Sequence, residues 1–328
     1  MTGWGMCAST ASMTQPIVRI GTRASKLALA QSGMMQRRIA TALGHPDRPD
    51  EVAPLVHITT TGDRVQDRRL LEVGGKALFT KEIEEALLDG RIDCAVHSMK
   101  DMPAELPPGL VIAAIPERED PRDAFLSNIA ANLDDLPTGA RLGTASLRRQ
   151  AQALHRRPDL DVQVMRGNVD TRLAKLNAGE ADAILLALAG LKRLGLGHLP
   201  ASLIDPIEAP PAPGQGALAI ETRAEDIGAG WLNYLRHEHT ALAVAAERGA
   251  LVALEGSCRT AIGAYAQLDG RVLSLIVEAL TPDGSLRVRR EGRIELPEHD
   301  PQGAARALGL ALGDEVREEG GDVLVLKD

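Results

Sequence analysis

The 328-residue sequence has very few aromatic residues and no long apolar run. Phe, Trp and Tyr together make up only 2% of the chain, so the aromatic platforms on which single-stranded nucleic acids stack are not expected. A net charge of −8 at pH 7 also argues against a general affinity for nucleic acids or anionic membranes. The longest apolar run, residues 183–191, is too short to span a bilayer. We therefore expect an ordinary globular protein of two or three domains, without a nucleic-acid or membrane partner.

Cysteine is also scarce. The three residues, Cys7, Cys94 and Cys258, have neither metal-site nor redox-motif spacing. Cys94 lies in an apolar run that predicts a buried strand, and Cys7 lies in an N-terminal tail, so a disulfide framework is not expected. Residues 1–15 lack both the basic segment and the apolar core of a secretory signal. These features predict a reduced, cytoplasmic protein with a disordered tail at residues 1–15.

A cluster of polar residues follows a short apolar run in the first third of the chain. The run Ile92–Val96 predicts a buried strand, and polar side chains crowd the positions between it and Pro103. Lys100 and Asp101 place a cation and a carboxylate on one short turn. In open α/β folds ligands bind beyond the carboxyl ends of strands, which favours a functional site here. A solvated loop after a strand would give the same pattern.

Two short patterns occur twice in the same order. Residues 19–22, Arg-Ile-Gly-Thr, resemble residues 141–144, Arg-Leu-Gly-Thr, and residues 90–93 resemble residues 179–182. The repetition predicts two domains of similar α/β design with a binding cleft between them. The proline-rich segment 210–216 cannot be helical, and we expect it to return the chain to the first domain as a second hinge segment.

The C-terminal part has a different pattern. Three strand-like runs joined by tight turns precede an Ala/Leu-rich helix that begins at Asp300-Pro301, which predicts a small α+β domain with a three-stranded antiparallel sheet. The charged, proline-punctuated residues 116–123 are typical of an interdomain linker. The expected division is domain 1 at residues 16–116 and 216–236, domain 2 at residues 117–215, and domain 3 at residues 237–328.

Two groups of residues point to chemistry. Cys258 lies on a loop beside Arg259, where a thiolate would be accessible and stabilised, although a free Cys often only fills a small space. Lysine occurs at only seven positions, and arginines are concentrated at predicted strand ends and on the helices that follow them. Because guanidinium groups bind carboxylates in bidentate fashion, these arginines predict a polycarboxylate ligand in the cleft. They are Arg23, Arg148, Arg149, Arg166, Arg172 and Arg193.

Five motifs taken together resemble those of the porphobilinogen deaminase (hydroxymethylbilane synthase) family. They are Val96–Asp101, Gly143–Gln150, Arg166–Val169, Pro213–Gly216 and Leu254–Cys258. The motifs occur in the family's order, and the resemblance runs from about Ile17 to the end of the chain. The sequence departs from the family pattern at Ala77, where Gly is usual, and at Ala145, where Ser is common.

The resemblance implies an enzyme of tetrapyrrole and haem biosynthesis. Such a transferase joins four porphobilinogen units head to tail, with release of ammonia, into hydroxymethylbilane. The implied fold is α/β, with two periplasmic-binding-protein-like domains joined by a two-segment hinge, plus the small C-terminal α+β domain. The resemblance also implies a monomer that needs no metal and carries a dipyrromethane cofactor, attached through a thioether to Cys258.

The resemblance further assigns roles to individual residues. Asp101 matches the catalytic carboxylate, which would stabilise the cationic methylene-pyrrole left by the loss of ammonia. The positions that match the family's cofactor-binding residues are Lys100, Asp101, Thr144, Ser146, Arg148, Arg149, Asn168 and Cys258. Those that match its contacts to substrate and growing chain are Arg23, Ser25, Arg166, Arg172, Arg193 and Gln215.

A second interpretation is a non-catalytic solute-binding or sensor module for a polycarboxylate. It explains the duplicated halves and the arginines, but it assigns no role to Cys258. Ehrlich's reagent separates the two interpretations, because it colours a bound dipyrromethane and leaves an empty binding module colourless.

Overall fold

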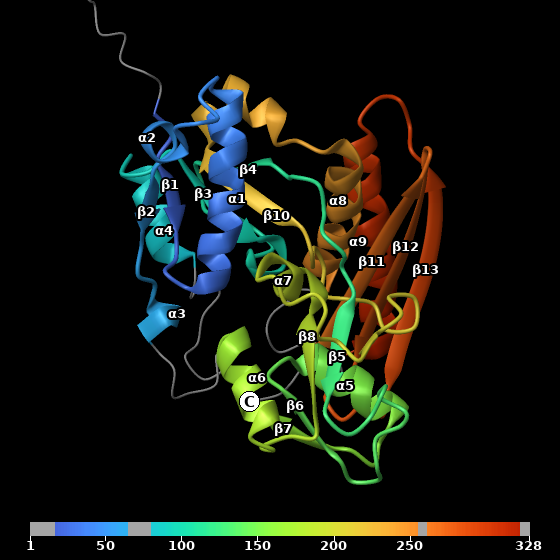
Figure 1. Cartoon of the computed structure of the whole chain (residues 1–328). Coiled ribbons are helices and arrows are strands. Elements are labelled where there is room, and N and C mark those ends of the chain that lie inside the picture. Colours follow the sequence, from blue (N-terminus) through green and yellow to red (C-terminus); the bar gives the residue numbers. More distant parts are fainter. Residues whose placement is uncertain (1–16, 65–79, 255–260, 322–328) are drawn as a thin grey trace, which may run out of the picture.

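The computed structural model describes residues 17–64, 80–254 and 261–321, which form three β-sheets with helices packed on them (Figure 1). Three sequence observations fall outside these residues: the predicted tail at residues 1–15, the departure from the family pattern at Ala77, and the attachment site Cys258.

The first sheet combines strands from distant parts of the chain. Its order is β2 (Leu55–His57), β1 (Ile20–Thr22), β3 (Cys94–Ser98), β10 (Leu218–Arg223) and β4 (Leu110–Ala114). The first three strands are parallel, and β10 runs antiparallel to both of its neighbours. The helices of this part are α1 (Lys26–Ala42), α2 (Pro49–Val52), α3 (Thr61–Arg64) and α4 (Lys81–Leu88), with 3-10 turns η1 (Met99–Asp101), η2 (Ala224–Asp226) and η3 (Gly230–Tyr234).

The second sheet repeats this arrangement. Its order is β7 (Asp161–Val164), β6 (Arg141–Thr144), β8 (Ala183–Ala187), β5 (Asp123–Ser127) and β9 (Ser202–Leu203). Here β7, β6 and β8 are parallel, and β5 is antiparallel to its neighbours. Its helices are α5 (Leu147–Arg156), α6 (Val169–Asn177) and α7 (Leu188–Arg193). The matching topology confirms the duplicated α/β design predicted from the two repeated patterns.

Two segments cross between these sheets. The chain leaves β4 and enters the second sheet as β5, and it leaves β9 and re-enters the first sheet as β10. The crossings touch one another, since the amide of Glu119 donates to the carbonyl of Gly216 at 3.2 Å. Gly216 has φ +91°, and a Cβ there would lie 2.2 Å from the Glu119 oxygen, so only glycine fits. The predicted return of the chain at residues 210–216 is confirmed.

Three polar residues begin helices at the edge where the parallel strands end. Ser25 caps α1, its hydroxyl accepting from the Ala28 amide at 3.3 Å. Ser146 caps α5 in the same way, and Asn168 caps α6 through its side-chain oxygen. Capping satisfies one amide of each first turn and leaves others free to bind anions. These helix starts therefore place backbone N–H groups that can bind anions at the carboxyl ends of the strands.

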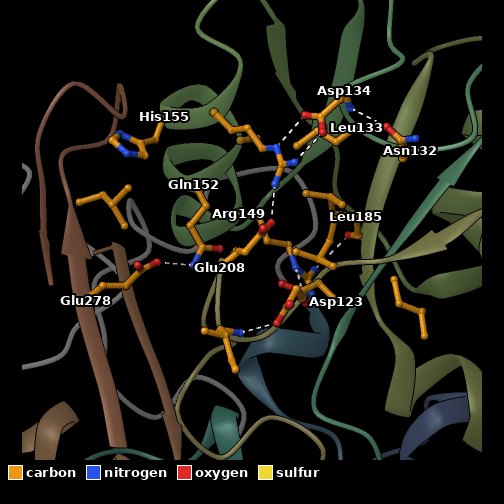
Figure 2. Close-up of a pocket in the computed structure, with 18 of the residues that line it drawn as sticks. Asp123, Asn132, Leu133, Asp134, Arg149, Gln152, His155, Leu185, Glu208 and Glu278 are labelled. Carbon is orange, nitrogen blue, oxygen red and sulfur yellow. Dashed lines mark hydrogen bonds and ion pairs between the residues drawn. The ribbon is translucent and has the colours of Figure 1, made fainter. Parts of the chain in front are cut away.

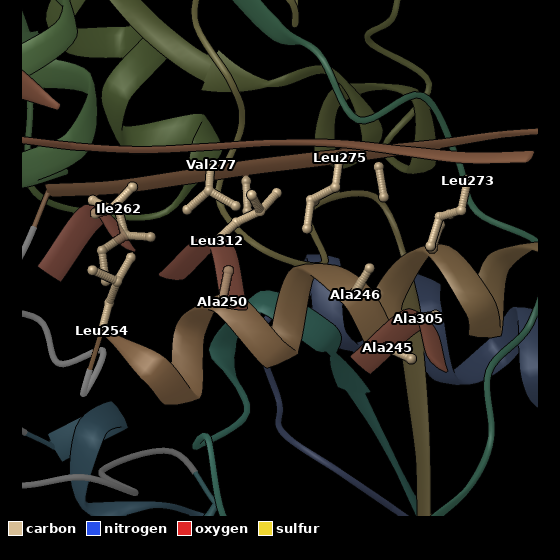
Figure 3. Packing of buried hydrophobic residues seen from close by; sticks show 14 of the residues in the cluster. Ala245, Ala246, Ala250, Leu254, Ile262, Leu273, Leu275, Val277, Ala305 and Leu312 are labelled. Atoms are coloured by element: carbon tan, nitrogen blue, oxygen red, sulfur yellow. The ribbon is translucent and has the colours of Figure 1, made fainter. Parts of the chain in front are cut away.

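The third sheet is antiparallel, in the order β11 (Ala261–Asp269), β12 (Val272–Leu280) and β13 (Arg287–Glu295). It packs on α8 (Glu238–Ala253) and α9 (Pro301–Gly320). Figure 3 shows Leu273, Leu275 and Val277 of β12 pointing towards the two helices, where small residues such as Ala246 allow close approach. The predicted three-stranded α+β unit is confirmed. Helix α8 begins at Glu238 because His237 caps it, its side chain accepting from the Thr240 amide.

Candidate active site

The helix starts of the first two sheets face one another. Lys26 in the first turn of α1 lies 2.7 Å from Asp170 in the first turn of α6, measured from Nζ to Oδ2. In Figure 1 the lower end of α1 points towards α6. Three of the site residues predicted from the sequence, Ser25, Ser146 and Asn168, begin helices at these strand ends.

A buried carboxylate organises the second sheet's side of the site. Asp123 is 4% exposed. Its two oxygens accept from Arg148 at 2.8 Å and from Arg149 at 2.8 and 3.1 Å. Burial alone would raise the pKa of Asp123, but the two guanidinium groups outweigh this effect and hold the pKa well below its usual range. Arg148 and Arg149, two of the predicted ligand-binding arginines, are therefore fixed in position by Asp123, a residue that the sequence interpretation did not select.

Gln215 connects the two halves of the site. Its amide nitrogen donates to Oδ1 of Asp123 at 2.8 Å, and its oxygen accepts from Nζ of Lys100 at 3.3 Å. Gln215 is 1% exposed and lies in the second crossing segment. Burial lowers the pKa of Lys100 to about 8, and the charge of Arg149 adds to this effect. Lys100 of the first sheet thus belongs to the same cationic cluster as the arginines of the second.

Two more predicted cations lie after β7. Arg172 on α6 donates to the carbonyl of Gly167 at 2.9 Å. Burial lowers the pKa of Arg172 to about 10, and the charges of Arg149 and Arg166 add to the effect. One buried nitrogen of Arg166, Nη1, has no hydrogen-bond partner among the residues that the structure describes. Unpaired donors and mutually repelling cations are the features expected of a site for a polyanion.

The remaining predicted residues are spread around this cluster. Thr144 is 2% exposed at the end of β6, where its hydroxyl accepts from the Ser146 amide at 3.1 Å. Arg193, at the end of α7, donates to the carbonyl of Gly216 at 2.5 Å. Burial lowers the pKa of Arg193. In the structure Arg193 therefore holds a crossing segment, beside the cluster around Asp123.

A small pocket contains the predicted catalytic carboxylate. Asp101 is exposed at the end of the η1 turn and shares this pocket with Arg23 and Ser25. The pocket has a volume of about 80 Å³ and lies between the starts of α1 and α4. His97 and Ser98 of β3 also line it. The structure thus brings Asp101 together with two of the residues that the sequence assigned to substrate.

A much larger cavity of about 750 Å³ lies behind the site, between the second and third sheets. Figure 2 shows Asp123 and Arg149 at one end of it and Glu278 of β12 at the other. Its charged side chains are largely paired with one another: Arg156 binds Asp134 at 2.5 Å, and Glu278 accepts from Gln152 at 2.7 Å. This cavity therefore has fewer unpaired cationic groups for an anionic ligand than the cationic cluster around Asp123.

Sequence reasoning missed two buried acids. Asp123 ends a charged stretch that was interpreted as a linker, and nothing local marks it as the partner of two arginines. Glu221 is completely buried in β10, where its carboxylate lies 2.9 Å from His97 Nε2. The one available signal was an acid directly after the apolar residues Leu218–Ile220, since buried acids are rare unless they are paired.

Two similar α/β units with cations at their facing strand ends, and an exposed carboxylate beside them, define an anion-binding protein equipped for acid–base chemistry. The comparison with family models gives the particular family. Residues 18–229 match the model described as porphobilinogen deaminase, dipyrromethane cofactor binding domain, and residues 241–318 match its C-terminal domain. The chain belongs to the porphobilinogen deaminase family, whose members are transferases that condense porphobilinogen in tetrapyrrole biosynthesis.

Individual relatives agree with this assignment. The chain is 70% identical over 319 residues to the porphobilinogen deaminase of Caulobacter vibrioides (strain NA1000 / CB15N), covering 96% of this chain and 99% of the relative. It is 71% identical over 318 residues to that of Phenylobacterium zucineum (strain HLK1), covering 95% and 99%.

Among solved structures, a periplasmic substrate-binding protein of an ABC transporter from Coxiella burnetii aligns with a TM-score of 0.41 and 15% identity, over 67% of this chain and 90% of that one.

Within residues 17–64, 80–254 and 261–321, no helix is long and apolar enough to cross a membrane. The same residues contain no group of His, Cys, Asp and Glu arranged to hold a metal ion.

Proposed function

We propose that this chain condenses porphobilinogen at the Asp101 pocket and holds the dipyrromethane cofactor and the growing chain on the adjacent cationic cluster. The observation that carries the proposal is the excess of positive charge in that cluster. Lys100 and Arg172 both have lowered pKa values, partly because other cations lie near them. A ligand that brings several carboxylates would relieve this repulsion.

The residues present fit the dipyrromethane group. Each of its two pyrroles carries an acetate and a propionate, so it needs several cationic or N–H donors close together. Nε of Arg148 and Nη1 of Arg166 are buried donors without a partner among the described residues. The helix starts at Ser146 and Asn168 add backbone amides on the same side.

The binding roles follow from these positions. Lys100, Thr144, Ser146, Arg148, Arg149 and Asn168 would hold the cofactor. When bound, the cofactor supplies the pyrrole end to which new units are added. Arg23, Ser25, Arg166, Arg172, Arg193 and Gln215 would bind the carboxylates of the substrate and of the growing chain. Cys258, five residues beyond the end of α8, would form the thioether to the cofactor.

Asp101 would act on the incoming substrate. Its carboxylate is exposed in the pocket, so it can approach the pyrrole nitrogen and the aminomethyl group of porphobilinogen. A fixed negative charge there stabilises the positive charge that develops as ammonia leaves. Arg23, in the same pocket, is suited to hold a substrate carboxylate and so to orient the ring.

We also propose the domain division expected from the sequence, with residues 16–116 and 216–236, 117–215, and 237–328 as the three domains. The membership of the three sheets supports it, because β10 belongs to the first sheet and β5 to the second. Cysteine usage supports a cytoplasmic setting, and we propose a monomer, which sedimentation equilibrium would test.

The decisive experiment is intact-mass spectrometry combined with Ehrlich's reagent. The purified protein should exceed its sequence mass by two condensed pyrrole units and should give a coloured adduct. Cys258→Ser should lose both signals, whereas Cys94→Ser, which alters a buried free thiol, should keep them. An unmodified protein that still forms hydroxymethylbilane would reject the proposed attachment, and a protein that forms none would reject the function.

A further inference from the structure

A buried acid–base pair lies directly behind the Asp101 pocket. His97 on β3 belongs to the pocket wall, and its Nε2 lies 2.9 Å from Oε2 of Glu221 on β10. His97 is 7% exposed and Glu221 is fully buried. Burying a carboxylate is costly unless a hydrogen-bonded partner compensates for the lost water. The pair therefore joins a buried acid, whose other oxygen Oε1 has no hydrogen-bond partner among the described residues, to a histidine that lines the pocket.

Other charged side chains lie close to this pair. Glu84 on α4 is the second acid packed against it. Burial raises the pKa of Glu84, an effect that the Thr80 hydroxyl and His97 oppose. The negative charge of Glu221 adds to this rise. The charged groups on the pocket side are Arg23 and Asp101.

We propose that His97 is a second catalytic residue of the condensation, the base that removes a proton from pyrrole carbon, and that Glu221 is its positioning residue. This inference rests on the proposed function. When the Glu221 carboxylate accepts the hydrogen on Nε2, the other ring nitrogen, Nδ1, holds an unshared electron pair. A carboxylate that fixes the tautomer of an imidazole in this way is the usual means of making histidine a directed base.

The reaction requires such a base in every cycle. The C–N bond of the ammonium form of porphobilinogen breaks, and its electron pair leaves with ammonia. The free α-carbon of another pyrrole uses its π electrons to form the new C–C bond. The C–H bond at that carbon then breaks, its electrons restore the aromatic ring, and its proton passes to Nδ1 of His97. His97 gives this proton to the departing ammonia, which becomes ammonium, and returns to its starting form.

Two residues serve this cycle better than one. Asp101 stabilises positive charge only while it is ionised, and it would lose that ability if it also took up the proton. A separate base on β3, the strand that leads into the turn of Asp101, leaves the Asp101 carboxylate charged throughout. The short separation in sequence, from His97 to Asp101, places both groups on the wall of one small pocket.

The first test uses porphobilinogen with deuterium at its free α-carbon. His97→Gln keeps an N–H near Glu221 but provides no base, so kcat should fall about 10²-fold. The ratio of rates with light and deuterated substrate should rise, because proton removal becomes the slow step. His57→Gln, at an exposed position on β2, is the matched control and should keep the wild-type ratio. An unchanged ratio in His97→Gln would overturn the proposal, whatever the loss in rate.

The second test determines which nitrogen of the His97 imidazole carries the hydrogen. In ¹⁵N NMR spectra of the wild-type holoenzyme, His97 should carry its hydrogen on Nε2, and Glu221→Gln should weaken that preference. A hydrogen on Nδ1 in the wild type would overturn the proposal, even if His97→Gln failed to fold. A wild-type enzyme that makes no hydroxymethylbilane would reject the proposed function. An active enzyme with the wrong tautomer would reject only the role of His97.

Discussion

Two buried carboxylates lie on the two strands that enter the sheets after a crossing, and their partners are of different kinds. Asp123 on β5 is bound by two guanidinium groups. Glu221 on β10 is bound by one imidazole. Arginine keeps its charge at any ordinary pH, whereas histidine can gain and lose a proton.

This difference separates two kinds of chemistry within a duplicated architecture. In the second sheet the carboxylate holds cations rigidly in place, which suits the binding of a polycarboxylate. In the first sheet the carboxylate holds a group that can exchange protons, next to the pocket of Asp101. Under the proposed function, the same topology would supply an anion-binding half and a proton-transfer half.

Removing the Asp123 charge should have the largest effect on stability. Asp123→Asn leaves two buried guanidinium groups short of a counter-charge, and breaking a buried ion pair typically costs about 3–5 kcal/mol. Asp134→Asn is the matched control, because Asp134 binds Arg156 at the surface. Such pairs contribute about 0–1 kcal/mol. Denaturant unfolding of both variants measures the difference, and equal losses would contradict the role given to Asp123.

The pH dependence of the same variant gives a second check. The pKa of Asp123 is held below its usual range in the folded protein, so its stabilising effect is present above about pH 4 and is lost as the pH falls further. Wild type and Asp123→Asn should therefore converge in stability under acid conditions.

Removing the Asp101 charge should instead affect rate. Asp101→Asn keeps the size and a hydrogen-bonding oxygen, but it cannot stabilise a cation as a carboxylate does. Losing one preorganised electrostatic contact typically costs about 10²–10³ in rate. Asp101→Glu keeps the charge on a longer arm and should retain more activity than Asn. Single-turnover elongation measures both variants, and Asn equal to or better than Glu would reject Asp101 as the catalytic charge.

The features that local sequence could predict are those set by neighbours along the chain. The C-terminal antiparallel sheet and the helix that begins at Asp300-Pro301 follow from local turns and capping, and the structure has them. The repeated Arg-x-Gly-Thr pattern predicted the duplicated sheets, because each copy forms the carboxyl end of a parallel strand, β1 or β6.

The buried partners could not be predicted in this way. Asp123 is 25 residues from Arg148 and 92 from Gln215, and Glu221 is 124 residues from His97. Nothing local indicates which acid will meet which base once the crossing segments fold. The sequence consequently identified the cations of the site but not the carboxylate that holds Arg148 and Arg149.

The two arginines bound to Asp123 should respond differently to a change to lysine. Arg149 donates from three nitrogens, to Asp123, Gln215 and the Leu185 carbonyl. The hydrogen bonds of Arg148 all come from Nη1. A lysine at position 149 can replace a smaller share of the arginine's hydrogen bonds than a lysine at position 148. Each buried acceptor left unpaired costs about 1–3 kcal/mol. Unfolding free energies should therefore fall more for Arg149→Lys than for Arg148→Lys, and the reverse order would contradict these assignments.

The smallest expected effect concerns Lys100, which lies where the two halves meet. Its pKa is lowered from 10.5 to about 8, so between these values the unfolded chain binds more protons than the folded one, and stability should rise with pH. Lys100→Met should remove this rise in the cofactor-free Cys258→Ser protein, whereas Lys81→Met, exposed on α4, should preserve it. Carboxylates of a bound cofactor would raise the pKa of Lys100 and so flatten the same rise in the loaded protein. Thermal unfolding from pH 7.5 to 10.5 measures all four proteins. An identical slope in the loaded and cofactor-free forms would show that the ligand's carboxylates do not reach Lys100, and the two halves would then not share one anionic ligand.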